Sequence, residues 1–118
     1  MQWTIGDPVN AGDPVPNAPS NLRAQSSGSG RILLGWDDNS NNESGFIVER
    51  KMTAGATWTA IAETGFSVAI YLDTGVTDGV SYDYRVRAYG VPGSSAYSNV
   101  ATSQSGATLD SQRWNLYE

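Results

Sequence analysis

Apolar and polar residues alternate along much of the central part of the chain. In "RILLGW" and "SYDYRVRAY" every second residue is apolar or aromatic, and "GFIVERK" keeps the same spacing. A period of two is typical of antiparallel strands that have one buried face and one face in water. The side chains that this pattern assigns to the core are Ile32, Leu34, Trp36, Phe46, Val48, Tyr82, Tyr84, Val86 and Ala88.

The alternating runs are short and are separated by Gly, Asn, Asp and Ser. They predict strands at residues 21–27, 31–37, 45–52, 57–63, 67–73, 80–90 and 96–103, and no amphipathic helix lies between them. Short strands at a spacing of about ten residues are typical of a β-sandwich. The sequence therefore predicts an all-β fold of the seven-stranded immunoglobulin-like kind.

The wet faces of two predicted strands carry opposite charges. Glu49 and Lys51 lie on one strand, and Arg85 and Arg87 lie on another. If these strands pair, we expect Glu49 to form a cross-strand ion pair with an arginine. An exposed pair of this kind would contribute less than about 1 kcal/mol.

The two ends of the chain differ from its centre. Residues 1–17 contain Gly-Asp-Pro-Val twice, and four of the five prolines lie within residues 6–19. Proline lacks an N–H and fixes φ, so this segment predicts an extended arm and not a helix or a central strand. We therefore divide the chain into an N-terminal Pro-rich arm (1–17), one β-sandwich domain (18–105) and a C-terminal tail (106–118).

Composition excludes several classes of function. The net charge of −5 argues against a nucleic-acid partner, and no apolar run is long enough to span a membrane. The chain has no Cys and no His, which removes thiolate chemistry and the commonest general base. The opening "MQWTIGDPVN" has no basic region and no long apolar stretch, so we expect no signal peptide in this chain.

The string from "PSNLRAQ" through "RILLGWDDNSNNESGFIVERK" to "SAYSNV" resembles a fibronectin type III domain of the bacterial and phage kind. In this resemblance Trp36 is the core tryptophan. The segment "GVTDGVSYDYRVRA" is similar to the tyrosine-corner region, with Val76 in place of Leu and Asp78 in place of Pro. Tyr82 would be the corner tyrosine, whose hydroxyl bonds to upstream backbone. The resemblance implies a sandwich of a three-stranded and a four-stranded sheet, without catalysis or a cofactor.

The polar run "DDNSNNE", residues 37–43, has two interpretations. Oxygen-rich loops bind calcium when oxygens lie at positions 1, 3 and 5, with Gly at 6 and Glu at 12. Counting from Asp37 places Asn42 at position 6 and Val48 at position 12, and counting from Asp38 places Glu43 at position 6. The pattern fails in both registers. We therefore predict a structural turn and no metal site, with a cation site as the alternative.

Other kinds of site are weakly supported. No G-x-S-x-G motif is present, and nothing near Ser44 could act as a base, so we predict that the chain is not an enzyme. The hairpin "YGVPGSSAY" has no Arg-Gly-Asp. For four aromatic residues we predict a role in packing, and sugar stacking is the alternative. They are Trp58, Tyr71, Tyr89 and Tyr97.

The terminal segments carry the candidate partner-binding residues. Free tails are usually polar, but each of these carries a Trp with aliphatic neighbours, and Trp and Tyr are enriched at interface hot spots. The residues that we assign to partner binding are Trp3, Ile5, Trp114, Leu116 and Tyr117. We expect them to contact a protein partner or neighbouring subunits, in a homo-oligomer or on a larger assembly.

Two functions follow as hypotheses. In the first, the chain is a non-catalytic building block of a virion or another extracellular assembly, such as a phage capsid decoration or tail protein. In the second, it is a spacer or accessory module of a secreted bacterial multidomain enzyme that acts on polysaccharide. In that case the "GDPVNAGDPVPNAP" segment is an interdomain linker.

Overall fold

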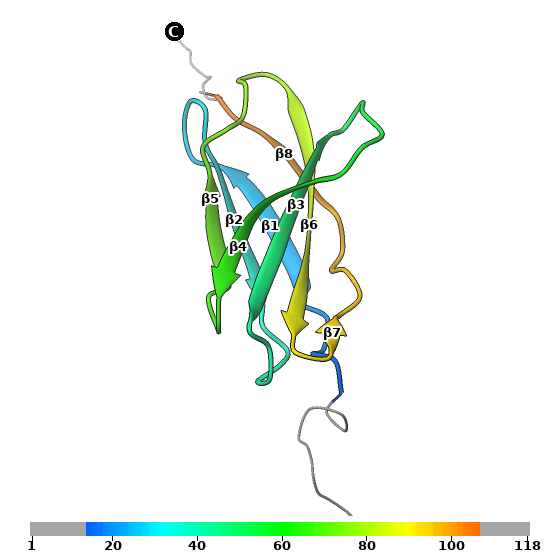
Figure 1. The fold of residues 1–118 in the computed structure, drawn as a ribbon. Helices are drawn as coiled ribbons and strands as arrows, with labels where there is room; N and C mark the ends of the chain where they lie inside the picture. Colours follow the sequence, from blue (N-terminus) through cyan, green and yellow to red (C-terminus); the bar gives the residue numbers. More distant parts are fainter. Residues whose placement is uncertain (1–13, 107–118) are drawn as a thin grey trace, which may run out of the picture.

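Two antiparallel β-sheets pack face to face in the computed structural model, which describes residues 14–106 (Figure 1). The smaller sheet has the strand order β1–β2–β5. Its strands are β1 (Ser20–Ser26), β2 (Ile32–Asp37) and β5 (Ile70–Asp73). The larger sheet places β4, β3 and β6 side by side, and β7 and β8 both pair with β6. Its strands are β3 (Gly45–Met52), β4 (Thr59–Gly65), β6 (Ser81–Gly90), β7 (Gly93–Ser94) and β8 (Ala101–Gln104).

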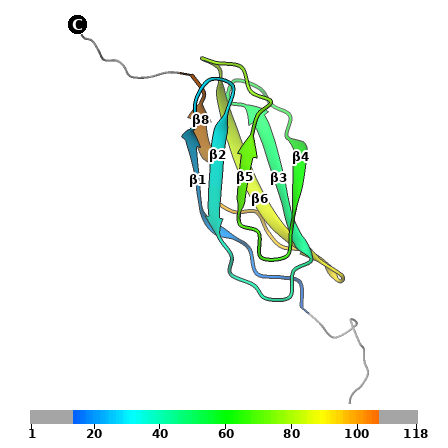
Figure 2. The ribbon, with the colours of Figure 1, turned by 90° about the vertical axis from the view of Figure 1, so that its left-hand side faces the viewer.

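The predicted strand positions are confirmed for the first six strands, with shifts of up to three residues at their ends. In Figure 2, β1, β2 and β5 of the smaller sheet lie next to one another, and β3 and β4 of the larger sheet lie beyond β5. Within residues 14–106 there is no helix of the length and hydrophobicity needed to cross a membrane.

The seventh strand differs from the prediction because it is interrupted. The sequence predicts one strand over 96–103, but the structure has two short pieces, β7 and β8, on the same edge of β6. Between β7 and β8, two serine hydroxyls accept hydrogen bonds from backbone N–H groups of β6. In an uninterrupted strand, backbone carbonyls would accept these bonds. Ser95 Oγ accepts from Ala88 N (2.9 Å), and Ser98 Oγ accepts from Val86 N (3.1 Å). The larger sheet therefore has five strands instead of the expected four.

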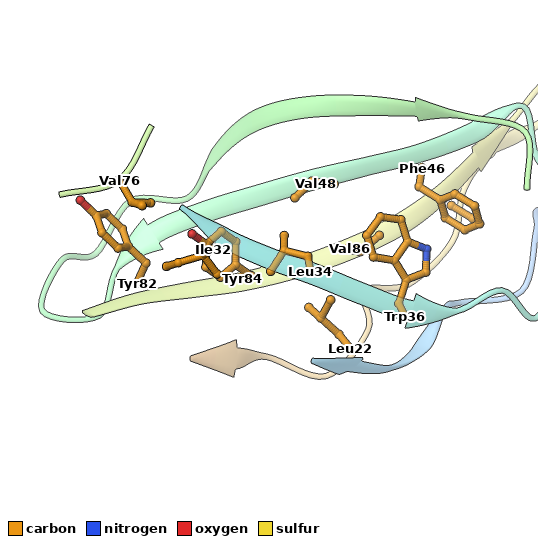
Figure 3. Close-up of a cluster of buried hydrophobic side chains, with 11 residues drawn as sticks. Leu22, Ile32, Leu34, Trp36, Phe46, Val48, Val76, Tyr82, Tyr84 and Val86 are labelled. Carbon is orange, nitrogen blue, oxygen red and sulfur yellow. The ribbon is translucent and has the colours of Figure 1, made fainter. Parts of the chain in front are cut away.

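The core lies between the sheets and contains every residue that the alternation assigned to it (Figure 3). Leu22 and Val76 complete it. Trp36 is 3% exposed, and its ring meets that of Phe46 edge to face with centroids 5.5 Å apart. Aromatic pairs in this arrangement contribute about 0.5–1.5 kcal/mol beyond their buried area. The assignment of Trp36 as the core tryptophan is confirmed.

The tyrosine corner is also present. Tyr82 lies in β6 and is buried, and its Oη accepts a hydrogen bond from the backbone N–H of Thr77 at 3.1 Å. Val76 packs beside it in the core, where the family usually has Leu. The bond ties the loop between β5 and β6 to the larger sheet.

The described chain enters at one end of the sandwich and leaves at the other (Figure 1). At the entry, Pro16 is buried and lies against Gly90, where an added Cβ would be 3.3 Å from the proline ring. At the exit, Gly106 N donates to Gly28 O at 3.3 Å, next to the turn between β1 and β2. The two ends of the described residues, 14–106, are therefore held apart by the length of the strands.

Candidate interaction surfaces

The outer face of the larger sheet carries the predicted ion pair. Glu49 in β3 pairs with Arg85 in β6, and Glu49 Oε1 lies 2.7 Å from Arg85 Nη2. The Glu49 side chain is only 10% exposed and that of Arg85 is 25% exposed, so the pair is more shielded from water than the exposed pair that the sequence analysis considered. Removing one partner would therefore leave a shielded charge unpaired, and we expect this to cost more than breaking a surface pair.

Two aromatic rings cover this ion pair. The Arg85 guanidinium lies 3.8 Å from the centroid of Tyr97 and 4.3 Å from that of Trp58. Tyr97 Oη also donates to Glu49 Oε2 at 2.8 Å. Burial raises the pKa of the Tyr97 phenol, and its bond to the Glu49 carboxylate raises that pKa further. Charge, stacking and hydrogen bonding together fix these four side chains on the sheet face.

Packing contacts account for three of the four aromatic residues that the sequence analysis names as alternative sugar-stacking positions. Trp58 and Tyr97 each have one ring face against Arg85. Tyr71 in β5 packs against the hydrophobic core. Tyr89 lies at the far end of β6, opposite Gly45 in β3. The packing interpretation therefore explains Trp58, Tyr71 and Tyr97 without a bound sugar.

A second polar group lies next along the same face. Lys51 Nζ is 3.1 Å from Asp83 Oδ2, and the hydroxyls of Thr53 and Thr102 donate to Asp83 Oδ1. Burial raises the pKa of Asp83, but these hydrogen bonds and the lysine charge outweigh it and leave the pKa below its ordinary value. The carboxylate therefore joins β3, β6 and β8 in its charged form.

The acidic loop between β2 and β3 is a turn, as predicted. Asp38 Oδ1 accepts from Ser40 N at 3.0 Å, which is the side-chain-to-backbone bond typical of such turns. Glu43 is buried and accepts from Ser40 Oγ (2.8 Å) and from Ser67 N (3.0 Å). Burial raises the pKa of Glu43, but the hydrogen bonds outweigh it and keep the pKa lowered. No group of three acidic residues within 14–106 is arranged to hold a metal ion.

The same loop holds the incoming N-terminal segment. Asn39 Nδ2 donates to Ala18 O at 2.9 Å, and Asn17 Nδ2 donates to Asn39 O at 2.9 Å. Asn42 Nδ2 donates to Pro14 O at 3.1 Å. Three amide side chains thus fix residues 14–18 against the end of the sandwich, and this accounts for Asn39 and Asn42 of the polar run.

Asp78 accepts hydrogen bonds from several segments at the opposite end of the sandwich. Its carboxylate accepts from Ser105 Oγ (2.6 Å), from Ser29 Oγ and from Gly30 N (2.7 Å). The hydrogen bond from Ser105, followed by those from Ser29 and Gly30, lowers the pKa of Asp78. The sequence analysis noted Asp78 only because the family often has Pro there. In the structure it joins the β1–β2 turn, the β5–β6 loop and the end of the last strand.

A buried charged network connects the two sheets. Asp73, at the end of β5, is 2% exposed and accepts two hydrogen bonds from Arg50 Nη1 in β3, at 2.8 and 2.9 Å. Tyr84 Oη in β6 donates to Asp73 Oδ2 at 2.7 Å, and Gly75 N donates to Oδ1 at 3.0 Å. Burial, with the bond to Asp73, raises the pKa of Tyr84 well above its ordinary range. Pattern analysis did not find this network, because its members lie far apart in sequence.

The outer face of the smaller sheet is different, because it presents aliphatic side chains to solvent. Leu33 and Leu72 are cross-strand partners and are 40% and 39% exposed, and Ile70 on the same face of β5 is 56% exposed. We call Leu33, Ile70 and Leu72 the aliphatic patch. Exposed apolar patches mark an interaction surface when they are larger than a few hundred Å².

The predicted partner-binding residues cannot be assigned to any of these surfaces. Trp3 and Ile5 precede the described residues, and Trp114, Leu116 and Tyr117 follow them. Their role therefore stays a prediction.

Similarity to known proteins points to one fold family. No family model matches the chain. An amylopullulanase from Thermoanaerobacterium thermosulfurigenes is 33% identical over 87 residues, which are 74% of this chain and 5% of that enzyme. The chain thus spans only a small part of this curated relative.

Solved structures agree with the fold. A Fn3-like protein from Clostridium thermocellum superposes with a TM-score of 0.65 at 27% identity, over 80% of this chain and 98% of that chain. A structure of titin domains superposes with a TM-score of 0.70 at 20% identity, over 79% of this chain and 33% of that chain. The second likeness concerns the fold alone.

Proposed function

Because this chain folds as a fibronectin type III domain, we propose that it is a non-catalytic accessory module of a bacterial enzyme that degrades polysaccharide. The observation that carries the proposal is the 33% identity to a segment of an amylopullulanase. That segment is 5% of the enzyme, which is the proportion expected of one small module in a long multidomain chain.

The geometry of the described ends supports a spacer role. The chain enters beside the β2–β3 loop and leaves beside the β1–β2 turn, at opposite ends of the sandwich (Figure 1). The ten residues of β6 correspond to a length of about 33 Å. Both ends are fastened by side-chain hydrogen bonds, from Asn42 at the entry and from Ser26 Oγ to Gly106 O at the exit. A module built in this way holds its neighbours at a fixed separation.

The virion hypothesis receives less support. It rests on the aromatic residues of the two terminal segments, which lie outside the described residues. One relative, at 33% identity, is named an amylopullulanase, and a structural relative at 27% identity is a Fn3-like protein from Clostridium thermocellum. We therefore prefer the accessory-module function.

The native reading frame of the gene tests the proposal. We expect the frame to continue beyond these 118 residues into a catalytic domain for polysaccharide hydrolysis. A frame that encodes only these 118 residues, in a cluster of virion genes, would overturn the proposal in favour of the first hypothesis.

A reducing-sugar assay tests the non-catalytic part separately. The purified chain should release no sugar from pullulan or amylopectin, whereas the enzyme carrying the module should release sugar under the same conditions. Release by the isolated chain, at a rate proportional to its concentration, would refute the non-catalytic assignment.

A further inference from the structure

The free side of β5 is an unprotected sheet edge. β5 lies at the end of the smaller sheet and pairs with β2 alone within residues 14–106. Proteins usually protect such an edge with a lysine, a proline, a bulge or a covering segment. The strand reads Ile-Tyr-Leu-Asp, and its one charged side chain, Asp73, is buried against Arg50. The side chains of β5 therefore offer no charge that would oppose the approach of another strand.

The other edges of the sandwich carry features that β5 lacks. β4 has an exposed Glu63, and a register shift interrupts its pairing with β3. On β1, both backbone groups of Leu22 are bonded to the Asn99 amide. The edge beside β6 is divided between β7 and β8, where the hydroxyls of Ser95 and Ser98 bond to β6. Among the described strands, β5 is therefore the edge that is most open to an added strand.

The alternation of hydrogen bonds shows which backbone groups of β5 point to the free side. Trp36 N donates to Ala69 O at 3.2 Å, so these two residues form a hydrogen-bonded pair. Facing residues in antiparallel strands alternate between bonded and non-bonded pairs, so the N–H and C=O groups of Ile70 and Leu72 point away from β2. Val68 follows the same alternation, because its N–H and C=O bond to the preceding turn and not to β2. Ile70 and Leu72 thus offer two donors and two acceptors at the edge.

A second copy of β5 is complementary to these groups. When two β5 strands lie antiparallel with Ile70 opposite Leu72 of the other copy, each such pair exchanges two hydrogen bonds. The two pairs together use all the free donors and acceptors. On the outer face Leu33 lies opposite Leu72, and Ile70 of the second copy continues this aliphatic row. The exposed Ile70 side chain thereby gains an apolar cross-strand neighbour.

We propose that the chain forms a two-fold symmetric dimer in which β5 pairs antiparallel with β5 of a second copy. The contact joins two three-stranded sheets into one continuous sheet, and it is isologous because each copy contributes the same residues. β5 is only four residues long, and interfaces that bury less than about 1,200 Å² are typical of weak complexes. We therefore expect a weak dimer that dissociates on dilution. The inference rests on this chain alone and not on the proposed enzyme.

Sedimentation equilibrium of the whole chain, at concentrations up to about 1 mM, measures the association. The average mass should rise from that of a monomer toward that of a dimer. In parallel NMR spectra, the amide resonances of Ile70 and Leu72 should shift along the same concentration curve. Their hydrogen exchange should slow as the dimer forms, because these N–H groups acquire acceptors.

Two lysine variants test whether β5 is the contact. Ile70→Lys places a charge on the edge and should weaken association by about tenfold or more. Val100→Lys is the matched control, since Val100 is 52% exposed and Ile70 is 56% exposed, and both changes alter the net charge equally. Val100 follows Asn99, which bonds to β1 at the other side of the smaller sheet, so this variant should associate like the wild type. Cooperative melting of both variants verifies that the sandwich is retained.

Four outcomes would overturn the proposal. The first is a chain that stays monomeric up to about 1 mM. The second is that Val100→Lys weakens association as much as Ile70→Lys does. The third is a dimer in which the exchange of the Ile70 and Leu72 amides is no slower than in the monomer, which would indicate contact through side chains alone. The fourth is that these amides are equally protected at every dilution, which would mean that the edge is covered within a single copy.

Discussion

Replacing Asp73 with Asn removes the charge on which donors from Arg50, Tyr84 and Gly75 converge. The carboxylate side chain is 3% exposed and that of Arg50 is 25% exposed, so water can replace little of the lost interaction. Hydrogen bonds to a charged group contribute about 1.5–3 kcal/mol each, and breaking a buried ion pair costs about 3–5 kcal/mol. Because Arg50 keeps some contact with water and Asn can still accept one bond, we expect Asp73→Asn to cost about 3 kcal/mol.

Urea denaturation followed by circular dichroism measures this loss. With a urea slope of about 1.5–2 kcal/mol per molar, the midpoint should fall by about 1.5–2 M while the slope stays unchanged. Tyr84→Phe removes one of the bonds and should cost about 1.5–3 kcal/mol. In the double variant the two losses should sum to more than the observed loss, because both substitutions break the same bond at 2.7 Å.

The matched control is Asp37→Asn. Asp37 also faces an arginine, Arg23, but at 3.5 Å and with side chains that are 52% and 59% exposed. The same substitution there should change the free energy of unfolding by less than about 0.5 kcal/mol. If Asp73→Asn were as mild as Asp37→Asn, the buried network would not be a major source of stability and the reasoning would be wrong.

Three further predictions concern other parts of the sandwich. Gly45→Ala should cost at least about 1–3 kcal/mol in thermal unfolding, because the new Cβ would lie 2.1 Å from Thr64 O. Its cross-strand partner gives the control, since Gly65→Ala meets nothing closer than 4.0 Å and should unfold near the wild-type temperature. Glu49→Gln should cost about 2–3 kcal/mol in urea by leaving Arg85 stacked without a counter-ion, and an unchanged midpoint would contradict this. Asp78 has a lowered pKa, so its bonds stabilise the fold above the ordinary value of 3.8 and lose that effect as the pH falls through the lowered pKa. Asp78→Asn should therefore lower the urea midpoint at neutral pH more than in strong acid, and an equal loss at both would refute the linkage.

The alternation of apolar and polar residues predicted the features that depend on neighbouring positions in the sequence. The alternation identified the core face of each strand, and it placed Glu49 opposite an arginine before the register was known. The resemblance to a family supplied the roles of Trp36 and Tyr82. These features repeat with the period of the strand or lie within one short motif.

The features that sequence analysis missed depend on contacts between distant segments. Asp73 and Arg50 are separated by 23 positions, and Asp78 and Ser29 by 49. No periodicity connects such pairs. The interrupted seventh strand had a weak local signal, because Ser95 and Ser98 can replace backbone acceptors, but serine is also common in uninterrupted loops. The aliphatic patch was visible as apolar residues, and only the three-dimensional register showed that Leu33 and Leu72 share an outer face.

The placement of the two ends of the described chain has a mechanical consequence. Tension applied at Pro14 and Gly106 acts along the strands, since Pro14 is bonded to the β2–β3 loop at one end of β2 and Gly106 to the β1–β2 turn at its other end. Antiparallel hydrogen bonds run perpendicular to the strands, so sliding β1 past β2 would load them together. The Asn99 amide adds a cross-link, because it accepts from Leu22 N at 2.8 Å and donates to Leu22 O at 3.0 Å. Pulled from its ends, this domain would resist extension in shear and then yield abruptly instead of peeling open one bond at a time.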